Sequence, residues 1–365
     1  MLQTPIRRIS FPAIVLCSVL QLFSAVDQSS AEISGPLAAG NADATLARYN
    51  PQTQVSGSFK IQGSETMYPL LSRLSLEFQR HQPKVGIDVK GGGSTKAIAE
   101  FLQPPLGRTG KVMLLEERAS NFTMIASSRE LFDAEIKEFA DQNGYEPTAV
   151  PVAVDAVALY VHKDNPLSGL TLEQVDAMFS TTRNSGYKTA ITQWGHLGLT
   201  NGWERAAIQL YGRDRKSGTR AFFQDHCLAG GEFMPGLHEA PGAASVILDI
   251  SRDQLGIGYS GLGLQASSVR MVPLAETVGM PFVTPSSATV ADQTYPLRRV
   301  LYLYVNKSPK TSLPTAVQEF LVFIMSYEGQ QAVMKAGFFP LPASQASKSS
   351  VALGLSPLPK PTAVR

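Results

Sequence analysis

Apolar residues recur along the middle of the chain with two different periods, and stretches of the two kinds alternate. Short apolar or alternating runs predict strands over 59–61, 85–89, 150–161 and 208–211. Spacings of three and four residues predict helices over 67–78, 97–102, 172–179 and 313–336. Such alternation is typical of an α/β architecture, in which ligands contact the carboxyl ends of strands.

Three loops in this pattern bring glycine and hydroxyl side chains to the start of a predicted helix. They read Gly63-Ser64-Glu65-Thr66, Gly91-Gly92-Gly93-Ser94-Thr95 and Arg213-Asp214-Arg215-Lys216-Ser217-Gly218-Thr219. A helix start carries unpaired N–H groups and partial positive charge, and glycine lets a ligand approach the backbone closely. Hydroxyls can surround an anion without adding charge, and one arginine can bind it bidentately. Together the loops indicate a site for a tetrahedral anion.

Composition and charge favour a globular protein whose anion site is local. With 365 residues and 44% hydrophobic composition, the chain can bury a large core in two domains or lobes. The 32 basic and 30 acidic residues leave a formal charge of +2, and no dense run of Lys or Arg occurs. Neither a nucleic-acid partner nor an anionic membrane surface is therefore expected.

Both ends of the chain differ from this pattern. Arg7 and Arg8 precede an apolar run over 11–23 and small residues near 24–31, which predicts a cleaved signal peptide over 1–31 and an exported protein, periplasmic or extracellular. The run is shorter than the roughly 20 residues that a membrane span needs. Residues 32–55 and 342–365 have the composition of a flexible leader and a flexible tail, and 104–120 that of an inserted surface loop.

Cysteine and histidine give no sign of a metal or redox centre. Once the signal is removed, Cys227 is the one cysteine left, so no intrachain disulfide is expected, and we interpret it as a small buried residue. The five histidines lack metal-ligand spacing. We expect no cofactor and no metal.

The order of motifs from about Gly57 to Leu341 resembles the phosphate-specific substrate-binding proteins of bacterial ABC importers, a PBP-like family. Besides the three loops, the matching segments are Ala126-Ser127-Ser128-Arg129, the run 151–158, Ile191-Thr192-Gln193-Trp194, Glu328-Gly329-Gln330-Gln331 and the run 337–341. Each motif is weak alone, but the ordered set at compatible spacing is fairly specific.

The resemblance implies the type 2 periplasmic-binding-protein fold, with two α/β lobes joined by a two-strand hinge and the ligand cleft between them. Lobe 1 would comprise 56–153 and 285–341, and lobe 2 would comprise 154–284. The resemblance further implies a monomer that binds inorganic phosphate without catalysis and delivers it to an ABC permease and ATPase.

Carried over position by position, the resemblance also implies the phosphate-binding residues. They are Ser64, Thr66, Met67 (through its backbone N–H), Ser94, Thr95, Thr123, Ser128, Arg213, Ser217, Gly218 and Thr219. Arg213 matches better than Arg215 because it precedes Ser217 by four residues. Thr123 occupies a position, six residues before Arg129, where the family usually has a proton-accepting aspartate that disfavours sulfate. Asp155 is a possible replacement for that acceptor.

Several alternatives stay open at this stage. Arg129 has the character of a structural ion-pair residue, and Asp155 fits a structural salt bridge as well as a site role. The ligand could be another tetrahedral oxyanion, such as sulfate or molybdate, and the protein could be a phosphate-sensing surface module without a transporter. Ser185-x-x-Lys188 and Lys216-Ser217-Gly218 superficially match a serine hydrolase, but no Ser-x-Asn element lies between them.

Overall fold

The computed structural model describes residues 33–34, 42–51, 53–103, 124–263 and 265–354. The predicted signal peptide, the predicted surface loop over 104–120 and Thr123 lie outside these residues. None of the helices within the described ranges is long and apolar enough to cross a membrane.

A nine-stranded mixed sheet organises the described chain. In spatial order its strands are β3 (Val85–Lys90), β2 (Gly57–Gly63), β4 (Met124–Ser127), β13 (Arg298–Val305), β5 (Thr148–His162), β9 (Gly256–Gly261), β7 (Gln209–Arg213) and β8 (His238–Ala240), and β11 (Val269–Met271) also pairs with β5. β2 is parallel to both of its neighbours, and so is β7. β5 and β13 are antiparallel to every strand they contact.

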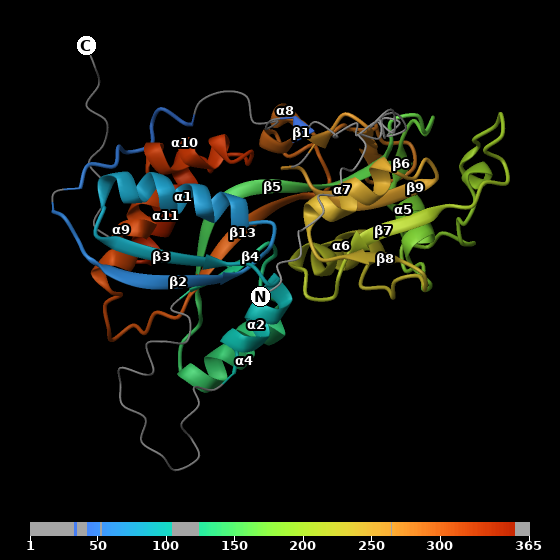
Figure 1. Ribbon diagram of the computed structural model, residues 1–365. Helices are drawn as coiled ribbons and strands as arrows, with labels where there is room; N and C mark the ends of the chain where they lie inside the picture. Colours follow the sequence, from blue (N-terminus) through green and yellow to red (C-terminus); the bar gives the residue numbers. More distant parts are fainter. Residues whose placement is uncertain (1–32, 35–41, 52, 104–123, 264, 355–365) are drawn as a thin grey trace, which may run out of the picture. The chain divides into compact units, whose positions relative to one another are not determined.

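The long strand β5 connects the two groups of parallel strands. It pairs with β13 over 148–156 and with β9 over 157–161. Figure 1 shows β5, in green, beside β13, in orange, although the two are far apart in sequence. Residues 150–161 are all buried, which explains an apolar run that only Asp155 interrupts. The predicted strands and the α/β architecture are confirmed.

Helices pack on both groups of strands. They are α1 (Tyr68–His81), α2 (Ser94–Phe101), α4 (Asp133–Asn143), α5 (Leu172–Phe179), α6 (Gly218–Leu228), α7 (Ala243–Ser251), α8 (Ser287–Ala291), α9 (Thr315–Ile324), α10 (Tyr327–Lys335) and α11 (Ala343–Ala352). A 3₁₀ turn covers Trp194–Leu197, and two short pairs join β1 (Ile33–Ser34) to β10 (Gln265–Ala266) and β6 (Leu170–Thr171) to β12 (Leu274–Ala275). The helix predicted over 313–336 is two helices, because Ser326 caps α10 by accepting the Gly329 N–H at 3.1 Å.

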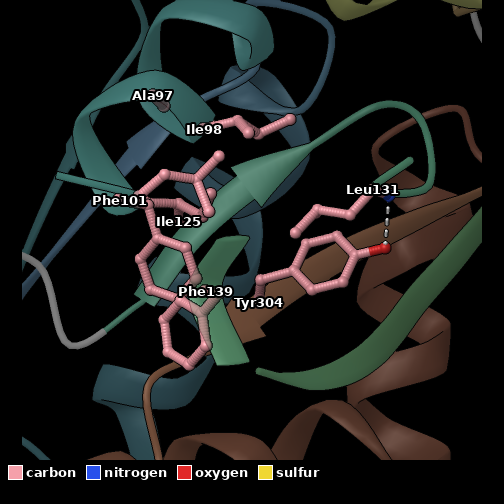
Figure 2. Packing of buried hydrophobic residues seen from close by; sticks show 8 residues of the cluster. Ala97, Ile98, Phe101, Ile125, Leu131, Phe139 and Tyr304 are labelled. Atoms are coloured by element: carbon pink, nitrogen blue, oxygen red, sulfur yellow. Dashed lines mark hydrogen bonds between the residues drawn. The ribbon is translucent and has the colours of Figure 1, made fainter. Parts of the chain in front are cut away.

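Aromatic side chains hold α2 and α4 against the sheet (Figure 2). The Phe101 and Phe139 rings stack with centroids 4.9 Å apart, over Ile125 of β4 and Tyr304 of β13. The Tyr304 hydroxyl accepts the Leu131 N–H at 3.0 Å. This cluster fixes the chain that follows β4, which carries part of the site described below.

Parts of the segments predicted to be flexible are packed, and this corrects the sequence-based expectation for them. Within the leader, Ala42, Leu46, Tyr49 and Val55 are buried. The Tyr49 hydroxyl donates to Glu319 at 2.9 Å, and its ring meets the edge of Phe323 at 5.2 Å. Residues 343–352 of the tail form α11. A few widely spaced apolar anchors hold these segments, and a composition rich in small residues conceals such anchors.

Replacing Tyr49 with alanine is expected to lower the free energy of unfolding by about 3 kcal/mol, because a buried ring and its hydrogen bond are lost. Urea titration followed by circular dichroism would measure this. The adjacent Arg48, whose side chain is 59% exposed, provides the control, and Arg48→Ala should change stability by no more than about 0.5 kcal/mol. If Tyr49→Ala, Arg48→Ala and the wild type have the same free energy of unfolding, the segment around Tyr49 is not part of the folded body.

Candidate functional site

The loop between β2 and α1 presents two buried hydroxyls. Ser64 and Thr66 are 2% and 7% exposed. The Met67 N–H, which sequence reasoning placed among the anion donors, donates to the Ser64 carbonyl at 3.2 Å and to the Ser64 hydroxyl at 3.3 Å. The helix that follows, α1, packs into the core through its buried side chains Leu70, Leu71 and Leu74. This packing holds the loop at the carboxyl end of β2.

The glycine loop between β3 and α2 brings Ser94 against the end of β4. The Ser94 hydroxyl accepts the Ser128 N–H at 3.1 Å and lies 3.2 Å from the Ser128 hydroxyl. Glu65 holds the loop from the other side, since its carboxylate accepts the Gly92 N–H at 2.5 Å. Ser94 and Ser128 are both buried, at 0% and 1% exposure.

The loop between β7 and α6 supplies a third helix start. Ser217 is the N-cap of α6, and its hydroxyl oxygen accepts the Thr219 and Arg220 N–H groups at 3.1 and 3.4 Å. These bonds use the oxygen as acceptor and leave the hydroxyl hydrogen available to a ligand.

Two glycines allow the α2 and α6 starts to touch. Gly93 has φ +96°, and a Cβ there would lie 2.2 Å from the Lys216 carbonyl oxygen, so this position requires glycine. The Lys216 carbonyl accepts the Thr95 N–H at 3.0 Å. A Cβ on Gly218 would lie 2.5 Å from the Ser94 Oγ and 2.7 Å from the Ser128 Oγ.

Arg213 carries a buried positive charge without a carboxylate partner. It ends β7, is 1% exposed, and donates through Nη2 to the Pro241 carbonyl at 2.9 Å. Its Nε and Nη1 are buried and make no hydrogen bond to any described residue. Burial, and next the nearby charge of Arg299, lower the pKa of Arg213 below its ordinary value. An anion would relieve both effects, whereas the neighbouring Arg215 is exposed.

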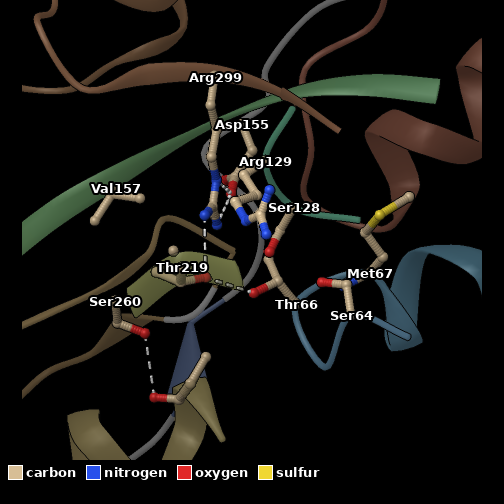
Figure 3. A network of polar contacts seen from close by, with 12 residues as sticks. Ser64, Thr66, Met67, Ser128, Arg129, Asp155, Val157, Thr219, Ser260 and Arg299 are labelled. Carbon is tan, nitrogen blue, oxygen red and sulfur yellow. Dashed lines mark hydrogen bonds and ion pairs between the residues drawn. The ribbon is translucent and has the colours of Figure 1, made fainter. Parts of the chain in front are cut away.

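A second buried arginine, Arg299, lies beside the site and was missed by sequence reasoning (Figure 3). It pairs with Asp155 through Nε and Nη2, at 3.0 and 2.7 Å, and its Nη1 donates to the Thr219 hydroxyl at 3.0 Å. Thr219 is in turn 3.1 Å from the Thr66 hydroxyl. The sequence contains one signal that could have indicated Arg299. This arginine occupies a position on the buried face of the strand over 298–305, where an apolar residue would be expected.

The structure brings together most of the residues that the sequence singled out. Direct contacts link Thr66 with Thr219, Ser94 with Ser128 and Thr95 with Lys216. Arg129 instead forms a bidentate pair with Glu135, both bonds at 2.7 Å, so the ion-pair interpretation of this residue is confirmed. Thr123 lies outside the described residues. Within the described part of the chain, no three His, Cys, Asp or Glu side chains lie close enough together to hold a metal ion.

The arrangement is suited to binding an anion. It combines three helix starts, several neutral hydroxyls and one unpaired guanidinium. The Ser217 hydroxyl accepts backbone amides, and the Ser260 hydroxyl donates to the Ala243 carbonyl at 3.3 Å, so neither is paired with a base that could activate it. Cys227 is buried, which raises the pKa of its thiol well above the ordinary value.

Comparison with known sequences gives two findings. A family model described as a PBP superfamily domain matches residues 50–328. A protein of Pseudomonas aeruginosa named phosphate-binding protein PstS is 41% identical over 335 residues, which is 92% of this chain and 99% of that protein.

Solved structures agree in fold. A crystal structure of a Clostridium perfringens protein with bound phosphate matches with a TM-score of 0.61 at 23% identity, over 78% of this chain and all of that one. An ABC-type phosphate transport receptor from Vibrio cholerae matches with a TM-score of 0.57 at 20% identity, over 78% and 100% of the two chains. These likenesses and the mixed sheet show the type 2 periplasmic-binding fold.

If these helix starts bind an anion, replacing Gly218 with alanine should weaken the binding of inorganic phosphate, used as a probe, by at least about tenfold, because the added methyl would force Ser94 and Ser128 away from α6. Isothermal titration calorimetry would measure the affinity. Gly242→Ala is the matched control, since a Cβ there meets nothing closer than the Ser245 Oγ at 3.8 Å and the affinity should not change. Unaltered affinity in Gly218→Ala would show that this contact is not part of the binding state.

Proposed function

The chain is a member of the PBP superfamily, and from that membership and the geometry above we propose that it captures inorganic phosphate for an ABC-type importer. The observation that carries this proposal is Arg213, a buried guanidinium with two unpartnered nitrogens at the end of β7. A bound oxyanion would satisfy both nitrogens and neutralise the charge.

The hydroxyls around the three helix starts suit a compact anion. Ser64, Thr66, Ser94, Ser128 and Thr219 are all buried and carry no charge. Once a ligand replaces the Thr66–Thr219 and Ser94–Ser128 contacts, each hydroxyl can donate one hydrogen bond to an oxyanion, and Ser217 can do so while it caps α6. The Thr95 hydroxyl oxygen is also buried and has no hydrogen-bond partner among the described residues. Together these hydroxyls offer more hydrogen-bond donors than a single arginine could.

The proposed two-lobe organisation is supported by the way β5 and β13 lie between two groups of parallel strands. β2, β3 and β4 with α1 and α2 would form lobe 1, and β7, β8 and β9 with α6 would form lobe 2, close to the boundaries 56–153, 154–284 and 285–341. Contacts such as Thr66 to Thr219 then join the lobes. A closing cleft of this kind removes the anion from water, which strengthens each hydrogen bond to it.

We also propose how the protein is exported and to which partner it delivers phosphate. The protein would be exported by the signal over 1–31, act as a monomer, turn nothing over, and release phosphate to a permease and ATPase complex. The protein from Pseudomonas aeruginosa that is 41% identical is named for phosphate binding, and the Vibrio cholerae structure is described as an ABC-type transport receptor. Calorimetry of the mature protein with phosphate tests the core of the proposal, and no heat with any tetrahedral oxyanion at millimolar concentration would overturn it.

Arg213→Ala should weaken phosphate binding by one to two decades, because a charge-assisted bidentate contact is worth about 1.5–3 kcal/mol. Arg215→Ala serves as the matched control, since Arg215 is exposed in the same loop and should change affinity little. Arg129→Ala should reduce stability through the loss of the Glu135 pair and affect affinity less than Arg213→Ala. Calorimetric titrations of the three variants decide this, and equal losses from the first two would place the anion elsewhere.

Sulfate should compete measurably with phosphate in the wild type. Hydroxyls can turn a hydrogen or a lone pair towards the ligand and so reject neither anion, and Asp155 is already bound to Arg299. Thr123→Asp should suppress the competition if residue 123 occupies the acceptor position that the sequence implies. Competition titrations test both statements. Strong exclusion of sulfate by the wild type would point to Asp155 as the acceptor, and Asp155→Asn should then admit sulfate.

A further inference from the structure

The Asp155–Arg299 ion pair joins the two strands that link the halves of the sheet. Asp155 of β5 and Arg299 of β13 are direct partners in the antiparallel register. Their side chains are 1% and 2% exposed, and both Arg299 bonds end on the same carboxylate oxygen, Oδ2. Because the pair is buried and self-neutralising, its charge does not demand a ligand, in contrast to that of Arg213.

One Arg299 nitrogen is left over from this pair and reaches the anion site. Nη1 donates to the Thr219 Oγ1 at 3.0 Å, and Thr219 is the second residue of α6 and fully buried. A guanidinium has no acceptor, so Thr219 must accept in this bond. The single hydroxyl hydrogen of Thr219 then points away from Arg299, and it is left for a ligand when the Thr66 hydroxyl, 3.1 Å away, donates to Thr219.

We propose that Arg299 is a positioning residue that fixes the Thr219 hydroxyl as a hydrogen-bond donor to the bound oxyanion. The inference rests on the proposed phosphate-binding function and adds to it a residue that no sequence motif indicated. Asp155 of β5 holds the guanidinium of Arg299 in place on β13, and Arg299 acts on the ligand through Thr219.

This role differs from a purely structural one and from direct charge attraction. A structural ion pair would affect stability alone. A direct electrostatic effect would act on the ligand whether or not Thr219 has a hydroxyl. Positioning predicts that the effect of Arg299 on affinity exists only while that hydroxyl is present.

A double-mutant cycle tests this, with inorganic phosphate as the probe and calorimetry as the readout. The pair is removed as Asp155→Asn with Arg299→Gln, so that no buried charge is left uncompensated. This change is combined with Thr219→Ser, which keeps the hydroxyl, and with Thr219→Val, which keeps the shape and removes it. Arg298→Gln on the same strand is the control, because Arg298 donates to the Val290 carbonyl and makes no contact with Thr219.

We expect the paired change to weaken phosphate binding about tenfold in the wild type and in Thr219→Ser, and less than twofold in Thr219→Val. Arg298→Gln should leave affinity unchanged. An equal loss in the Ser and Val backgrounds, or no loss in either, would overturn the positioning role. Denaturant titration of every variant shows which of them are folded. Arg299→Lys alone keeps the charge, but a lysine cannot bond Asp155 and Thr219 in the same geometry. This variant should therefore weaken phosphate binding to a similar extent as the paired change.

The cycle separates this inference from the function on which it rests. Phosphate binding by the wild type, with loss in Arg213→Ala, supports the function whatever the cycle gives. If the wild type binds no phosphate, the function and the positioning role both fall.

Discussion

The antiparallel pairing of β5 with β13 is the constraint on which the rest of the structure depends. β5 pairs with β13 over its first part and with β9 over its second, so a single strand sets the geometry between two groups of parallel strands. Each group ends in loops that lead into helices, and strands pointing to a common region bring those helix starts together. The meeting of these helix starts is therefore a consequence of how the two strands are paired.

The buried arginines Arg299 and Arg213 differ in whether a carboxylate neutralises their charge. The charge of Arg299 is neutralised by Asp155, and its third nitrogen donates to the Thr219 hydroxyl. The side chain of Arg213 instead donates only to the backbone carbonyl of Pro241 among the described residues. Burying an unpaired charge is costly, and the depressed pKa of Arg213, caused first by burial and then by Arg299, reflects that cost. A protein tolerates such a group where a ligand of opposite charge completes it, which makes Arg213 the strongest single indication of an anion.

Discrimination between anions of similar charge depends on where the neutral hydroxyls lie, because the unpaired charge of Arg213 attracts every anion. Glycine at 218 lets α6 approach Ser94 and Ser128 closely, and glycine at 93 lets the α2 start meet the Lys216 carbonyl. The hydroxyls gathered at these helix starts have hydrogens that can rotate. Bonds such as those that the Arg220 and Thr219 amides donate to Ser217 limit that rotation, and the ligand would meet donors already oriented.

The sequence by itself determined the elements and the chemistry of the loops. Helical spacing located α1 and α2, and the apolar run located β5, whereas the choice of Arg213 over Arg215 came from the resemblance to the family pattern. These features are local, and local periodicity and turn chemistry are written directly in the residue order.

Only the tertiary structure decided which distant residues meet. Arg299 became visible as a site neighbour because β13 pairs with β5 and places it opposite Asp155, far away in the chain. The packing of Tyr49 against Phe323 and the pairing of Arg129 with Glu135 were settled in the same way. Composition indicated a flexible leader around Tyr49 because burial depends on a partner surface, and a single sequence without its fold does not contain the position of that surface.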